Sequence, residues 1–290
     1  MAGLAPGYRF TEHLIQLGDI TFGQVDEAGV HWHCEKAEGW EGPETRMDLA
    51  QREADHGAWP SPAYLSERVI TLSGKVVAPN RGACDEAFER LLAAAALTDT
   101  VLAVYETIPK QLVVRRSGKP LVQRLTGTVL EYSLLVTAAD PRRYALDEQS
   151  GTTPLPSTTG GLVFPLVFPV SFSAVTVAGE IRAENTGSFE TRPVLVIDGP
   201  VVAPTVFAQY DDGTVQRLAF SQTLAAGDRL VIDTDAHSVI LNGNASRRRF
   251  LSVPSGWPVI PARSVVRFQF RSDTYSPTAL LTARWRSAWI

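Results

Sequence analysis

The segment His31-Trp-His33-Cys34 contains side-chain types that commonly bind zinc. In a β-strand, successive side chains point to opposite faces, so His31 and His33 share one face while Cys34 lies on the other. The three groups therefore cannot easily converge on one ion, although His56 could complete a site from a distant loop. We interpret the segment as the polar edge of a strand and expect no metal and no other cofactor.

Carboxylates offer two further kinds of chemistry. The pair Asp211 and Asp212, or Asp233 with Asp235, could bind calcium, but the EF-hand loop pattern is absent and aspartate is common in turns. Two acidic residues could also hydrolyse a glycoside. The distance between two carboxylates is set in three dimensions and cannot be read from the sequence, in which no pair stands out. Serine-hydrolase, zinc-protease and phosphate-loop motifs are absent from the sequence. We therefore expect no enzymatic activity, and a hydrolase is the weakest of three hypotheses.

A few aromatic and basic residues near turns could contact a ligand. Trp257 and Tyr275 could stack on a sugar ring, although core or interface packing is the alternative. A basic cluster could contact phosphate or an acidic partner, or form a solvated turn; it consists of Arg247, Arg248 and Arg249. These five residues are the candidate contacts with a surface glycan.

Length and composition place these residues in a two-domain protein. The chain has 290 residues, of which 44% are hydrophobic and 20% charged. A chain of this length usually forms two hydrophobic cores rather than one. Residues 1–147 carry 15 Lys+Arg against 20 Asp+Glu, whereas residues 148–290 carry 12 against 11 and no lysine. Arginine tolerates partial burial at interfaces, although codon bias is the simpler explanation of its use.

Other features bear on the cellular compartment. Two cysteines, Cys34 and Cys84, do not form a disulfide framework. The most apolar run, Leu162 to Val170, is interrupted by two prolines and is too short to span a bilayer. We expect synthesis in a reducing cytoplasm and no membrane insertion.

The first half, residues 1–147, is predicted to be an α+β domain, an antiparallel sheet with one helix. Asn80 or Asp85 can cap the helix. One face of the helix carries its apolar residues Cys84, Phe88, Leu91, Leu92 and Ala95. The predicted elements are strands Phe10–Gly23, Val30–Cys34, Arg68–Val77, Val101–Tyr105, Gln111–Arg116 and Gly127–Ala138, and a helix Asn80–Leu97.

Between the second and third of these strands, residues Glu35–Pro62 show no sustained periodicity. The stretch contains seven acidic residues, three prolines and two tryptophans. A loop of this length in a compact domain is uncommon and is usually functional or forms an interface. The candidate interface residues in and beside it are Trp40, His56, Trp59 and Tyr64.

Residues 148–161 are rich in Ser, Thr, Pro and Gly and are predicted to be a linker. Beyond it, residues 162–290 alternate apolar and polar side chains, as at Val266, Phe268 and Phe270. Two predicted turns, Asp211–Gly213 and Thr234–Ala236, each join a pair of strands in a hairpin. The pattern predicts a β-sandwich or jelly roll, so the whole chain is expected to be mainly β.

The order of these motifs resembles the phage distal tail protein family (the siphophage tail component, or Dit, family). In the first half the matching residues are Trp40–Pro43, His56-Gly57, Arg68–Gly74, Asn80–Leu97 and Ala139–Tyr144. The second half is similar to the galectin-like or carbohydrate-module-like sandwich of many members, at Asn185–Gly187, Arg192-Pro193, Ile197–Gly199, Gly227-Asp228, Ile232–Thr234 and Arg284–Trp289.

The resemblance implies a structural protein of the virion tail tip or baseplate. The first domain would form a homo-oligomeric, hexameric ring joining the tail tube protein to tip, hub or receptor-binding proteins. DNA would pass through the centre without specific binding, and the excess of acidic residues in residues 1–147 suits such a passage. The second domain would project outward toward those proteins or the host surface. A carbohydrate-binding adhesion module that contacts a host glycan is the alternative function.

Overall fold

The computed structural model describes residues 14–94, 97–159 and 175–290. It divides into two compact units: unit 1 comprises Met1–Leu146 with Ile290, and unit 2 comprises Asp147–Trp289. The described residues are mainly β, as the sequence predicted, with a single α-helix among them. No helix in these ranges is long and apolar enough to cross a membrane.

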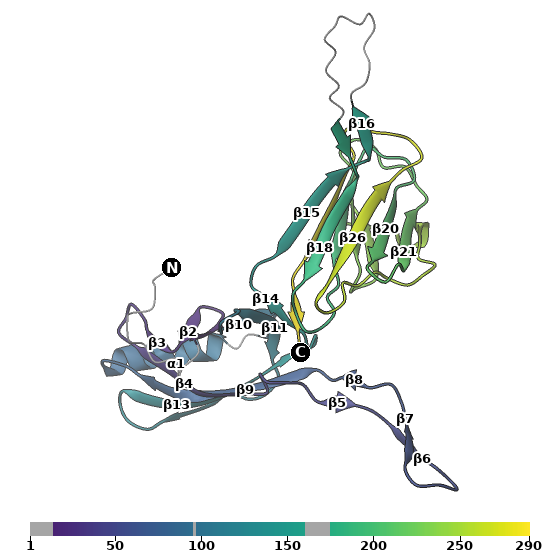
Figure 1. Cartoon of the computed structure of the whole chain (residues 1–290). Helices are drawn as coiled ribbons and strands as arrows, with labels where there is room; N and C mark the ends of the chain where they lie inside the picture. Colours follow the sequence, from purple (N-terminus) through teal and green to yellow (C-terminus); the bar gives the residue numbers. More distant parts are fainter. Residues whose placement is uncertain (1–13, 95–96, 160–174) are drawn as a thin grey trace, which may run out of the picture. The chain divides into compact units, whose positions relative to one another are not determined.

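Unit 1 is built on an antiparallel sheet in the order β2-β1-β10-β11-β13-β9-β4-β3, to which β12 adds beside β13 and β14 beside β11 (Figure 1). Its strands are β1 (Leu14–Leu17), β2 (Ile20–Phe22), β3 (Gln24–Val25), β4 (His31–Glu38), β9 (Arg68–Val77), β10 (Thr100–Tyr105), β11 (Lys110–Arg116), β12 (Leu121–Arg124), β13 (Val129–Ala138) and β14 (Arg143–Ala145).

Strands β9 and β13 show why this sheet has one buried face. They pair over their full length, and Ile70 and Leu72 of β9 are fully buried while Thr71 between them is only half-buried. Such alternation places every second side chain in the core. The predicted strand Arg68–Val77 is confirmed with the same bounds.

Helix α1 (Arg81–Ala94) packs against this core. The Asn80 side chain caps its first turn, because its Oδ1 accepts a hydrogen bond of 3.0 Å from the amide of Ala83. The predicted helix and its Asn80 cap are confirmed, and Phe88 of the predicted apolar face is half-buried. Ala95, also assigned to that face, lies outside the described residues. The buried residues of α1 are Cys84, Ala87, Leu91 and Ala94.

The turn between β3 and β4 is tied to α1 by the carboxylate of Asp26. Its Oδ1 accepts hydrogen bonds from the amides of Ala28 and Val30, at 3.0 and 2.9 Å. Its Oδ2 accepts from Trp32 Nε1 at 3.0 Å and from Arg90 Nη1 of α1 at 2.6 Å. Partial burial alone would raise the pKa of Asp26, but the hydrogen bonds from Trp32, Val30 and Arg90 outweigh it and lower the pKa below the ordinary value.

Replacing Asp26 by asparagine is expected to cost about 1–2 kcal/mol of unfolding free energy at neutral pH, because the charged partner of Arg90 is lost. Since the pKa of Asp26 is lowered from 3.8 in the folded state, its contribution is present above that pH and is lost as the pH falls through the folded-state value. Denaturant unfolding at several pH values measures the difference between wild type and Asp26→Asn, which should shrink in acid. The exposed neighbour Glu27→Gln is the control; a gap that does not depend on pH would contradict the assignment.

Unit 2 consists mainly of two antiparallel sheets, in the orders β15-β27-β19-β22-β23-β24 and β18-β26-β20-β21-β25. The first sheet contains β15 (Gln149–Pro154), β19 (Val194–Asp198), β22 (Arg229–Asp233), β23 (Ser238–Leu241), β24 (Ala245–Ser246) and β27 (Leu280–Trp285). The second contains β18 (Glu180–Asn185), β20 (Thr205–Tyr210), β21 (Val215–Phe220), β25 (Leu251–Ser252) and β26 (Ser264–Arg271). The remaining elements are the pair β16 (Ser157–Thr159) and β17 (Val175–Val177), the 3-10 turn η1 (Arg248–Phe250) and β28 (Ala288–Trp289).

The two sheets enclose one hydrophobic core, as in a β-sandwich. Phe268 and Phe270 of β26 are fully buried, whereas Gln269 between them is half-buried. Both predicted hairpins are confirmed, because β20 pairs with β21 and β22 pairs with β23. The predicted sandwich is therefore the fold of unit 2.

The structure differs from the linker predicted over residues 148–161. Residues 149–154 form β15, which pairs with β27 along its whole length. The strand lies at the edge of its sheet, and its polar residues include Ser150 and Thr152 on the exposed side. Gly151 lies so close to Ile181 that an added Cβ would be 2.5 Å from Ile181 Cγ2. A polar edge strand with a glycine at a tight contact has the composition of a linker, which is why the prediction was wrong.

Candidate functional site

The most unusual feature of unit 1 is a β-ribbon over residues 45–65, which we call the arm. Strand β5 (Thr45–Arg46) pairs with β8 (Tyr64–Leu65), and β6 (Leu49–Gln51) pairs with β7 (Ala58–Pro60). Figure 1 shows the arm extending away from the sheet of unit 1. The prediction of an irregular loop over residues 35–62 is therefore wrong, because β4 continues to Glu38 and a hairpin follows.

The arm has no core of its own. Most of its side chains are exposed on both sides of the ribbon. The large apolar ones are Met47, Leu49, Trp59 and Tyr64, with exposed fractions of 48, 55, 64 and 62%. A two-stranded ribbon in water is marginally stable at best. Exposed apolar side chains gathered on such an element are typical of a surface that a partner covers.

At the tip of the arm, the chain turns between Arg52 and Gly57, whose carbonyl accepts a 3.2 Å hydrogen bond from the Arg52 amide. The Arg52 guanidinium lies 4.3 Å from the centre of the Trp59 ring and contacts Asp55 through Nη1 at 3.3 Å. His56 is exposed in this turn. The cation–π contact orders the Trp59 side chain before any partner binds.

The arm leaves unit 1 at a buried arginine, Arg68. Its Nε donates to the carbonyl of Pro141 at 2.9 Å, and its Nη1 donates to the carbonyls of Gly39 at 3.2 Å and Trp40 at 2.6 Å. Burial, and then the charge of Arg143, lower the pKa of Arg68 to about 10, so it stays charged at neutral pH. The three carbonyls come from two segments far apart in sequence, and Arg68 fixes them together where the arm begins.

Trp40, predicted to be an interface residue, lies in the core of unit 1 with an exposed fraction of 7%. Its Nε1 donates a hydrogen bond of 2.5 Å to Glu106, and Lys110 Nζ lies 2.5 Å from the other carboxylate oxygen. Burial would raise the pKa of Glu106, but the hydrogen bonds from Lys110 and Trp40 lower it below the ordinary value. Trp40 therefore belongs to the core beside the base of the arm. The other three predicted interface residues, His56, Trp59 and Tyr64, are exposed on the arm itself.

The histidines considered for a metal site lie on β4. The rings of His31 and His33 contact each other, with centroids 3.7 Å apart, as expected for two residues on one face of a strand. Cys34 is half-buried, and His56 belongs to the tip of the arm. Within the described ranges, no three His, Cys, Asp or Glu side chains are grouped so that they could hold a metal ion.

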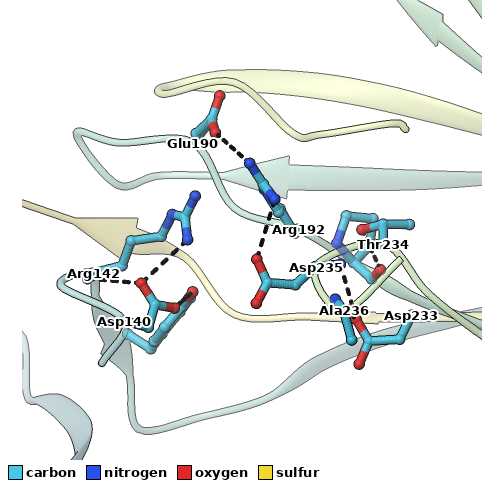
Figure 2. A network of polar contacts seen from close by, with 10 residues as sticks. Asp140, Arg142, Glu190, Arg192, Asp233, Thr234, Asp235 and Ala236 are labelled. Carbon is cyan, nitrogen blue, oxygen red and sulfur yellow. Dashed lines mark hydrogen bonds and ion pairs between the residues drawn. The ribbon is translucent and has the colours of Figure 1, made fainter. Parts of the chain in front are cut away.

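The aspartates considered for calcium act as turn residues in unit 2. Asp233 Oδ1 accepts hydrogen bonds of 2.9 Å from the amides of Asp235 and Ala236, and Asp212 Oδ1 accepts from the amide of Thr214 at 2.8 Å. Figure 2 shows the first of these turns beside Arg192, whose guanidinium contacts Glu190 at 3.6 Å and Asp235 at 3.4 Å. The same figure shows the Asp140–Arg142 contact of 3.2 Å, which belongs to unit 1.

A buried asparagine, Asn185, organises one end of unit 2. Its Nδ2 lies within hydrogen-bonding distance of the carbonyls of Phe189, Ile260 and Pro261, at 2.7 to 3.1 Å. Its Oδ1 accepts from the amides of Gly187 and Ala288, at 3.0 and 3.2 Å. Both ends of the fully buried amide are therefore satisfied, and one side chain joins three separate segments.

The residues that follow Asn185 match a family of known proteins. Residues 186–289 match the family model described as the siphovirus-type tail component, C-terminal domain.

Residues 186–289 are thus similar to a siphovirus-type tail component domain, and we call them the tail component domain below.

Solved structures extend the likeness to both units. The chain is similar to the crystal structure of the SPP1 Dit (gp 19.1) protein, described as a paradigm of hub adsorption apparatus in Gram-positive infecting phages. The TM-score is 0.59 at 12% identity, over 89% of this chain and 93% of that one. Two structures of the phage p2 baseplate in its activated conformation, with Ca and with Sr, each give a TM-score of 0.49 at 10% identity, over 94% of this chain and 97% of theirs. No curated protein matches the chain. The resemblance to phage distal tail proteins is confirmed, and the chain has the fold of a structural tail component.

In the tail component domain, Trp257 is not a free platform for a sugar. Its ring is half-buried against the core, stacks on His237 with centroids 4.8 Å apart, and lies 4.9 Å from the Arg248 guanidinium carbon. Arg247 precedes the 3-10 turn η1, and Arg249 within that turn lies 4.5 Å from the centre of the Phe250 ring. Tyr275 is separate and has an exposed fraction of 58%. The five glycan candidates are thus distributed between internal packing and the surface.

Sequence reasoning missed two buried polar residues, one within each unit. Arg68 opens an apolar strand directly after the arm, and Asn185 ends the alternating strand β18. A polar side chain at a position that alternation assigns to the core is the signal that could have identified both.

Proposed function

We propose that this chain assembles with copies of itself through unit 1, and that the arm of each copy lies against the next copy. The observation that carries the proposal is the arm itself, a ribbon without a core whose large apolar side chains are exposed. Elements of this kind gain stability when a partner covers them. A closed ring places every arm on a neighbour, and the family resemblance indicates six copies.

Within a virion, the ring would lie at the tail tip or baseplate, between the tail tube protein and the tip, hub or receptor-binding proteins. DNA would pass through its centre without specific binding, because residues 1–147 carry 15 basic against 20 acidic side chains. The chain would act as a structural part rather than as an enzyme, and it would be made in the host cytoplasm. The tail component domain and the Dit-like fold support this role.

The arm is tested by replacing its apolar side chains. We expect Trp59→Ala to weaken association of the copies by about 2 kcal/mol, roughly thirtyfold, because a large aromatic contact is lost. Leu49→Ser should act in the same direction. Sedimentation velocity over a range of protein concentrations measures the association, and circular dichroism checks that each variant is folded.

Leu97→Ser is the matched control, because Leu97 is 72% exposed in unit 1 but lies outside the arm. Association should be the same in this variant and in the wild type. Equal association in all three variants and the wild type would overturn the role of the arm, even if the chain forms an oligomer by another surface.

A further inference from the structure

A groove of about 360 Å³ lies on the five-stranded sheet of unit 2, at the edge formed by β21 and β25. Its volume is within the range of about 300–1,000 Å³ typical of small-molecule sites. The side chains important for its chemistry are Thr205, Arg217, Arg249, Phe250, Ser252 and Asp273. The groove belongs to unit 2 and the arm to unit 1, and the inference does not depend on ring formation.

Two guanidinium groups in the groove contact aromatic rings rather than carboxylates. The Arg217 guanidinium carbon lies 6.0 Å from the centre of the Phe207 ring, and these residues face each other across β20 and β21. The Arg249 guanidinium carbon lies 4.5 Å from the centre of the Phe250 ring. Both side chains are exposed, and neither forms an ion pair with any carboxylate of the described residues. Aromatic contacts order a guanidinium while leaving its N–H groups free to bind an anion.

The arginines only donate hydrogen bonds, whereas other side chains that line the groove can accept them. Asp273 is exposed at the groove and has no ion pair among the described residues, so its carboxylate can accept hydrogen bonds from hydroxyl groups. Thr205 lies on β20 and Ser252 on β25, the two strands that flank β21, and their hydroxyls can both donate and accept. A purely acidic peptide would be repelled by Asp273, whereas a sugar that carries one acidic group matches both the arginines and the carboxylate.

We infer that this groove binds a sugar unit bearing a phosphate or carboxylate, with Arg217 and Arg249 on the anion and Asp273 on the sugar hydroxyls. Beside Asp273, Ser272 Oγ donates a hydrogen bond of 2.6 Å to the carbonyl of Val202, which joins two segments next to the groove. The next residue, Ala203, lines the groove in the left-handed backbone region with φ 43°.

Saturation-transfer difference NMR on the full chain tests the inference with glucose 6-phosphate, glucuronate and glucose as probes. We expect both anionic sugars to bind in preference to glucose, and their relative affinity identifies phosphate or carboxylate as the preferred group. Arg217→Ala and Arg249→Ala should each lower the affinity about tenfold or more, because each removes a charge-assisted hydrogen-bonding partner. Asp273→Asn should weaken the sugars but not free phosphate.

Arg182→Ala is the control, because Arg182 is an exposed arginine on β18 of the same sheet but does not line the groove. It should leave the affinities unchanged. The inference is overturned if neither anionic sugar binds, or if the Arg217 and Arg249 variants bind as the wild type does. It is also overturned if inorganic phosphate displaces glucose 6-phosphate at equal concentration, since the sugar would then contribute nothing.

Discussion

Replacing Gly187 by alanine is expected to unfold one end of the tail component domain. A Cβ on Gly187 would lie 1.8 Å from the carbonyl oxygen of Ala288 and 2.5 and 2.7 Å from its carbonyl carbon and amide nitrogen. All three are backbone atoms, so no side chain can turn aside, and the hydrogen bonds between Asn185 and this region would be broken. We expect a loss of about 4 kcal/mol or more. Hydrogen–deuterium exchange should show the loss of protection in β18 and β26.

Two further variants make this result interpretable. Gly127→Ala places its Cβ in open space and should leave the protein unchanged. Asn185→Ala should reproduce part of the loss without any steric clash, because buried backbone groups around it lose hydrogen bonds to the Asn185 amide. A Gly187→Ala protein with the exchange pattern of the wild type would show that the backbones do not approach as described.

Replacing Arg68 by methionine should destabilise unit 1 by about 3 kcal/mol. Methionine is apolar and of comparable length, so the packing volume is largely kept while the carbonyls of Gly39, Trp40 and Pro141 lose their donors. Unsatisfied buried carbonyls are costly because no water replaces the lost hydrogen bond. Denaturant unfolding measures the loss, and exchange at residues 39–41 reports whether the base of the arm has opened.

Arg81→Met is the matched control, because Arg81 is an exposed arginine at the start of α1. It should change the unfolding free energy by less than about 0.5 kcal/mol. If Arg68→Met is as stable as this control, the three carbonyls do not depend on Arg68, and the anchoring of the arm needs another explanation.

The parts of the fold that could be predicted are those whose burial follows a regular period. Strand β9 alternates buried and exposed residues, and α1 combines an Asn80 cap with an apolar face, so both were identified from sequence. The hairpin turns at Asp211–Gly213 and Thr234–Ala236 were also identified, because turn chemistry is local. Each of these elements depends on contacts that a short window of sequence records.

The arm and β15 could not be predicted for a different physical reason. The arm is exposed on both faces, so its composition carries no alternation, and its pairing depends on residues about 20 positions apart. Strand β15 is polar and contains Gly151, which fits a close approach to Ile181 that only the folded sheet creates. Trp40 was assigned to an interface because tryptophan in an acidic stretch has no local sign of burial, whereas Glu106, its partner, lies 66 residues away.

The measurement that tests the central claim most directly is electron microscopy of the purified full-length chain at high concentration. Our account predicts closed rings, with a mass near six times 31.5 kDa by light scattering, in which each arm lies against the unit 1 of the next copy. A strictly monomeric protein, or rings in which residues 45–65 project freely into solvent, would contradict it.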